Sequence, residues 1–136
     1  MTRKYLPTFT ELIDRLSIVQ IKEVLIPAHK KEYSAEIKDI IHDINEILNN
    51  ETQEKTLTAE AIRAIIVIAQ MNLHIWHNES DYRNGKEGSR LELTHGLNGL
   101  RNTAKNKLTS EFSVEDRMDF KIDCLASEFK DWEISW

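Results

Sequence analysis

Two neighbouring stretches of the sequence concentrate side chains that could bind a ligand or take part in a reaction. Residues 70–83 supply an aromatic ring, an imidazole, a carboxylate and a guanidinium: Trp76, His77, Glu79 and Arg83. At 100° per residue, Asn72 falls on one line with Glu79 and Arg83, and apolar positions flank that line. Because buried polar groups must be hydrogen-bonded and buried charges paired, this line predicts specific partners for its members.

The second stretch, residues 91–108, carries a helix face that is rich in hydrogen-bond donors and contains no carboxylate. Its members are Thr94, Asn98, Arg101, Asn102 and Lys105. Arginine offers a planar bidentate fork and lysine a point charge, so such a face suits an anion and above all a phosphate group.

We expect the two stretches to form one ligand site, provided that both turn toward a common hollow. The cations would hold phosphate and the asparagines would contact polar edges. Trp76 or Tyr82 would stack on a ring, while His77 and Glu79 orient these groups. The predicted site residues are Trp76, His77, Glu79, Arg83, Asn98, Arg101, Asn102 and Lys105. This predicts a binding protein for a small anionic molecule, with a nucleotide or nucleotide-derived signal as the leading class.

Other interpretations of the same residues stay open. Both stretches could be solvated surface or a polar seam between helices. A metal-dependent hydrolase could use His74, His77, Glu79 and Asp81, but their spacing matches no known catalytic signature. We therefore predict no catalytic residue, metal or cofactor.

A third reading is a protein–protein inhibitor or adaptor. It rests on the aromatic C-terminus, Trp132 to Trp136, together with the acidic overall balance of the chain. An aromatic end of this kind also makes a homodimer a candidate assembly.

The totals limit the function classes. The chain has 136 residues and a net charge of −5, which fits one domain spanning 1–136 and argues against a binder of duplex nucleic acid. Cys124 is the only cysteine, which suits a reducing compartment. No stretch approaches the ~18–20 apolar residues of a membrane span, and no secretory signal is recognisable. We expect a cytoplasmic protein without a membrane partner.

Periodicity and capping residues predict an all-α fold, a compact bundle of about five helices with a long central one. The expected ranges are 8–26, 34–48, 58–83, 89–108 and 113–136. The first carries two apolar ridges, the second of them formed by Ile18, Ile21 and Leu25. Capping boxes begin the first and fourth ranges.

The long central helix presents apolar residues on two sides. The richer stripe contains Ile62, Ile65, Ile66, Ala69, Leu73 and Trp76. Ile68 and Ile75 lie on a separate side of the helix. We expect the richer stripe to face the core.

The stretches NLHIWHNESDYRNG and LELTHGLNGLRNTAKNKL, with the opening FTELIDRLSIVQIKE, resemble a group of short all-helical proteins of tailed bacteriophages. The shared pattern is an Asn-x-x-x-Trp-His-x-Glu helix followed by an Asn-x-x-Arg-Asn helix. The resemblance implies a viral origin and a role in the host cytoplasm, such as binding a host defence protein or its nucleotide signal. The group has no established activity, so it transfers no catalytic residue.

Overall fold

The computed structural model describes residues 6–49, 57–85, 91–112 and 134–136. The described residues form α-helices and one short 3-10 turn, with no strand among them, which confirms the all-α class. The helices are α1 (Phe9–Leu25), α2 (Lys30–Leu48), α3 (Ala59–Arg83) and α4 (Leu91–Glu111), with the 3-10 turn η1 at Pro27–His29. The fifth predicted helix, 113–136, lies outside the described residues except for its last three.

Local sequence signals mark where α1 and α3 begin, whereas Ser89, the expected cap of α4, lies outside the described residues. The Thr8 hydroxyl accepts a hydrogen bond from the Glu11 backbone N–H at 3.3 Å, and the Thr58 hydroxyl accepts one from Ala61 at 3.0 Å. Such caps satisfy backbone donors that the first helical turn leaves free. Pro27 ends α1 as expected, but α2 begins at Lys30 rather than near 34, because η1 leads into it without a loop.

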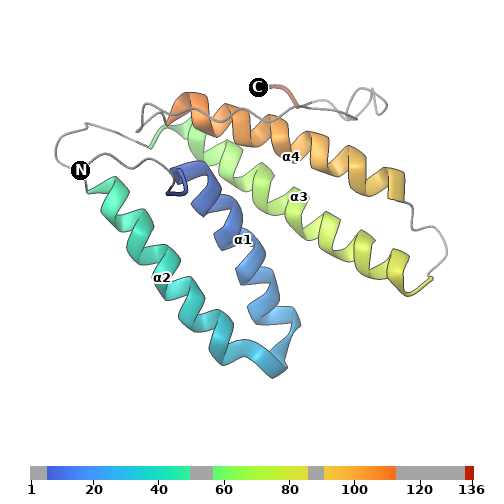
Figure 1. The fold of residues 1–136 in the computed structure, drawn as a ribbon. Helices are drawn as coiled ribbons and strands as arrows, with labels where there is room; N and C mark the ends of the chain where they lie inside the picture. The colour runs from blue at the N-terminus through green and yellow to red at the C-terminus, as the bar shows by residue number, and fades with distance from the viewer. Residues whose placement is uncertain (1–5, 50–56, 86–90, 113–133) are drawn as a thin grey trace.

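The four helices form two antiparallel hairpins that meet at one end and diverge at the other (Figure 1). The α3–α4 hairpin is the more extensively packed, and α1 lies against both of its helices. Of the four described helices, α2 packs closely only against α1. Helix α1 is therefore the element that connects the two hairpins.

The apolar core lies where the hairpins meet. The Phe9 and Phe112 rings are in contact there, with centroids 4.1 Å apart. Ile68 of α3 and Leu108 of α4 are fully buried in the same cluster, which also includes Ile44 of α2. Helical periodicity predicts a core stripe of Leu93, Leu97, Leu100, Ala104 and Leu108 on α4. The last four are buried, and Leu93 is half-buried.

Helix α3 buries the side that has fewer large apolar residues, not the richer stripe that was expected to face the core. Ile68 and Ile75 are buried, whereas Ile62, Ile66 and Leu73 of the richer stripe are each between 43% and 50% exposed. The expectation for those three residues was wrong. The buried side places Asn72 and small residues against α1 and α4, and so allows close packing and a polar contact that the isoleucine stripe would prevent.

None of the described helices combines the length and apolar character needed to span a lipid bilayer.

The assignment of the α3 faces is testable with two matched substitutions. Ile68→Val removes one methylene group from the fully buried side and should lower the free energy of unfolding by about 1 kcal/mol. Ile66→Val, two residues away on the exposed side, should change it by less than about 0.5 kcal/mol. Urea denaturation followed by circular dichroism measures both. Equal losses for the two variants would contradict the assignment.

Candidate functional site

The donor-rich face of α4 turns into the protein instead of facing water. Thr94 and Lys105 are buried, at 3% and 8% exposure, and Arg101 is half-buried. Helix α3 lies along this face and contacts Thr94 through a hydrogen bond from Asn78, and α1 covers the end that carries Lys105. A buried ammonium group requires a charged or strongly polar partner, and α1 supplies one.

Asp14 of α1 is the partner of Lys105. The lysine Nζ lies 3.2 Å from Oδ2 of Asp14, and the two side chains are only 10% and 13% exposed. The residues are 91 positions apart in the chain, so this ion pair joins the first helix to the last described one.

Asn72 of α3 completes the connection at the centre of the site. Its Nδ2 donates to Oδ1 of Asp14 at 2.8 Å and to Oγ of Ser17 at 2.6 Å. Its Oδ1 accepts a hydrogen bond from Nη1 of Arg101 at 3.0 Å. Both amide hydrogens and the carbonyl oxygen are used, so this asparagine connects three helices through one side chain.

The resulting cluster of Asp14, Ser17, Asn72, Arg101 and Lys105, called the polar cluster below, is one negative charge short. It holds two cations and a single carboxylate. The Nε atom of Arg101 is also buried and has no hydrogen-bond partner among the described residues. A guanidinium with an unused buried N–H can donate a hydrogen bond to a further anionic or carbonyl oxygen.

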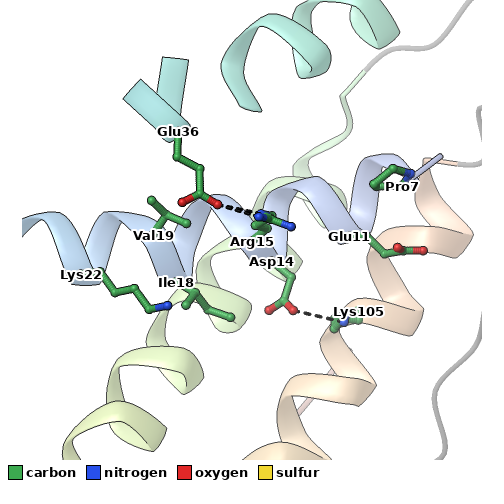
Figure 2. Close-up of a pocket in the computed structure, with 9 residues that line it drawn as sticks. All are labelled: Pro7, Glu11, Asp14, Arg15, Ile18, Val19, Lys22, Glu36 and Lys105. Atoms are coloured by element: carbon green, nitrogen blue, oxygen red, sulfur yellow. Dashed lines mark hydrogen bonds and ion pairs between the residues drawn. The ribbon is translucent and has the colours of Figure 1, made fainter. Parts of the chain in front are cut away.

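A pocket of about 440 Å³ opens beside the polar cluster (Figure 2). Most of its lining comes from α1, with Glu36 of α2 at one wall and Lys105 of α4 at the other. The complete lining is Pro7, Glu11, Asp14, Arg15, Ile18, Val19, Lys22, Glu36 and Lys105. Only Asp14 and Lys105 belong to both the polar cluster and the pocket.

Two of the three cations that line the pocket are in ion pairs with carboxylates. Arg15 is bound by Glu36, with Nη2 and Oε1 2.7 Å apart, and Lys105 is bound by Asp14. The ammonium group of Lys22 lies 6.0 Å from the centre of the Tyr33 ring, and no ion pair of the described residues includes it. Lys22 is therefore the lining cation that is most available to a ligand.

The predicted residues of α3 lie apart from the polar cluster. Trp76 and Glu79 are half-buried, while His77 and Arg83 are exposed. No hydrogen bond or ion pair in the described part of the chain joins any of these four to the donor face of α4. The donor-face residue Thr94 contacts a different residue of α3: the buried Asn78 donates from Nδ2 to the Thr94 hydroxyl at 2.6 Å. Asn98 and Asn102 are half-buried and do not line the pocket.

Asp14 and Ser17 are not among the site residues predicted from the sequence, although both contact Asn72. A signal was present, because Asp14 lies in register with the apolar ridge of Ile18, Ile21 and Leu25. A carboxylate aligned with an apolar ridge predicts a buried charge that needs a cation. The identity of that cation is a tertiary property that the helix pattern does not contain.

The described residues contain no group of three or more histidine, cysteine, aspartate or glutamate side chains placed to hold a metal ion. His74 and His77, which the hydrolase alternative requires, are exposed on α3.

Comparison with known proteins gives no matching protein family, no matching curated protein and no matching solved structure. The function of the site is therefore argued from its own residues.

The central role of Asn72 is tested by Asn72→Ala. This change leaves Asp14, Ser17 and Arg101 each without one hydrogen-bond partner, so we expect a loss of about 2–3 kcal/mol in the free energy of unfolding. Asn45→Ala on exposed α2 is the control and should cost little, since alanine favours a helix. Denaturant titration of the three proteins measures the difference. A loss below that caused by Asn45→Ala would contradict the role given to Asn72.

Proposed function

We propose that this chain is a non-enzymatic binding protein for a small anionic molecule, with a nucleotide or nucleotide-derived signal as the leading ligand class. The observation that carries the proposal is the charge imbalance of the polar cluster. The polar cluster holds two cations, Arg101 and Lys105, but one carboxylate, Asp14, and the adjoining pocket wall also carries Lys22.

The physical argument starts from the cost of burying charge. The Lys105 side chain is only 10% exposed and loses most of its hydration, and the one carboxylate beside it must also accept a hydrogen bond from Asn72. An additional anion would therefore find strong, poorly hydrated donors that are already held in place. Preorganised donors of this kind bind phosphate or carboxylate groups without a large cost in side-chain entropy.

The size and lining of the pocket support a small organic ligand. A volume of about 440 Å³ lies within the range of about 300–1,000 Å³ that is usual for ligand pockets. Ile18 and Val19 offer an apolar wall, and Lys22 and Lys105 offer charge. This combination suits a phosphate-bearing molecule with an apolar or aromatic part.

The site of this proposal is narrower than the one expected from the sequence. It centres on Arg101 and Lys105. Trp76, His77, Glu79 and Arg83 would contribute only if the ligand extends along the α3–α4 hairpin. The resemblance to phage proteins adds a biological setting to the proposal, in which the chain sequesters a nucleotide signal of the host.

Ligand binding is tested by thermal denaturation with phosphate and a panel of nucleotides at constant ionic strength. A ligand present at a hundredfold excess over its Kd stabilises the folded state by about 2.7 kcal/mol. We expect at least one phosphorylated compound to raise the Tm of the wild-type protein above that in matched sodium chloride.

Two lysine variants on the same helix localise the effect. Lys105→Gln should abolish the ligand-induced increase in Tm relative to the unliganded variant. Lys107→Gln, which removes a surface ion pair with Glu111, should retain it. The proposal is wrong if no phosphorylated compound stabilises the wild-type protein at millimolar concentration.

Binding of a protein partner is the second candidate, and the exposed apolar residues of α3 favour it. Ile62, Ile66 and Leu73 lie on one side of the helix, and Trp136 is 38% exposed with the Arg63 guanidinium 5.3 Å from its ring centre. The simplest partner is a second copy of the chain. Sedimentation equilibrium should then give a dimer for the wild type and a monomer for Ile66→Glu. If the wild-type protein remains a monomer at about 100 µM, this form of the alternative is wrong.

A further inference from the structure

We propose that Asp14 occupies the anion site of the unliganded protein and thereby sets its affinity, acting as an internal competitor of the ligand. This inference rests on the proposed function, because it concerns the same donors. In the unliganded protein, a carboxylate of the chain itself contacts these donors. This residue therefore regulates how tightly an external anion binds.

The geometry of the carboxylate supports this role. Oδ2 of Asp14 faces Nζ of Lys105 at 3.2 Å, and Oδ1 accepts a hydrogen bond from Nδ2 of Asn72 at 2.8 Å. Each oxygen thus contacts a donor that a bound phosphate or carboxylate oxygen would use. Figure 2 shows the Asp14 carboxylate at the pocket wall with its dashed contact to Lys105.

The competition follows from electrostatics at a poorly hydrated position. Asp14 and Lys105 are 13% and 10% exposed, so solvent screens their charges weakly. An incoming anion must either share Lys105 with a fixed negative charge or displace it. Both routes lower the affinity relative to a site that has no carboxylate.

Helix α1 gives the competition a structural consequence. The hydrogen bonds and the ion pair from Asp14 and Ser17 tie α1 to α3 and α4 within the polar cluster. An anion that takes over Lys105 releases part of this connection. Occupancy of the pocket is therefore coupled to how firmly the α1–α2 hairpin is held.

The test substitutes Asp14→Asn, which removes the negative charge and keeps the side-chain shape. Phosphate titration at constant ionic strength, followed by isothermal calorimetry, measures its Kd. We expect binding about tenfold tighter or more than in the wild type, because the competing charge is gone. The control is Glu36→Gln, which removes a carboxylate of the same pocket wall without touching Lys105, and should change the Kd by less than about threefold.

Each outcome bears on the proposal. Tighter binding by Asp14→Asn alone supports it. Equal or weaker binding by Asp14→Asn, with measurable binding by the wild type, overturns this inference and leaves the proposed function intact. An equal gain in both variants also overturns it, since the effect would then come from the general charge of the wall. If neither the wild type nor Asp14→Asn binds phosphate or a nucleotide, both proposals fail.

The charge removal in Asp14→Asn could itself unfold the protein, because it leaves the buried Lys105 without its carboxylate partner. In that case, the recovery of the helical circular dichroism signal of Asp14→Asn on adding phosphate replaces the calorimetric measurement. Recovery with phosphate but not with sodium chloride of equal ionic strength supports the proposal. No recovery, or equal recovery with both salts, overturns it.

Discussion

The structure depends on one constraint, the need to pair the charge of a buried lysine. Lys105 lies on the face of α4 that α1 and α3 cover, so its ammonium group has little access to water. Asp14 of the neighbouring helix α1 meets this need, with its carboxylate 3.2 Å from the ammonium group. The pair thereby fixes the position and the axial register of α1 against the α3–α4 hairpin.

Apolar packing and polar pairing have separate roles in this arrangement. The core around Phe9, Ile68 and Leu108 supplies the non-directional burial that holds the hairpins together at one end. The polar cluster supplies direction, since Asn72 must present its amide nitrogen to α1 and its oxygen to α4. Apolar residues would tolerate small shifts along the helix axes, whereas these hydrogen bonds do not.

The proposed ligand site therefore lies within the contact that organises the fold. Lys105, the cation that joins α4 to α1, lines the pocket, and Arg101 belongs to the same polar cluster through Asn72. A site of this kind links binding to stability, because a ligand competes with the internal contacts of the protein. It also explains why the donors are preorganised, since the fold already holds them for its own use.

The sequence by itself determined the helices and much of the chemistry. Thr8, Pro27 and Thr58 mark helix ends through caps and backbone geometry, and the 3.6-residue period gives α4 both its apolar stripe and its donor face. These features are local, because each depends on residues within about two turns.

Only the tertiary structure decided which sides of the helices meet. Helix α3 carries isoleucines on two sides, so its period alone could not select the buried one, and the burial of Asn72 follows from partners on α1 and α4. Likewise, the donors of Arg101 and Lys105 were readable from the sequence, but their pairing with Asp14 was not. A helix pattern records what each face carries. The choice between faces depends on contacts between residues that are far apart in the chain, such as Asp14 and Lys105 at a separation of 91 residues, and these contacts form only when both hairpins pack.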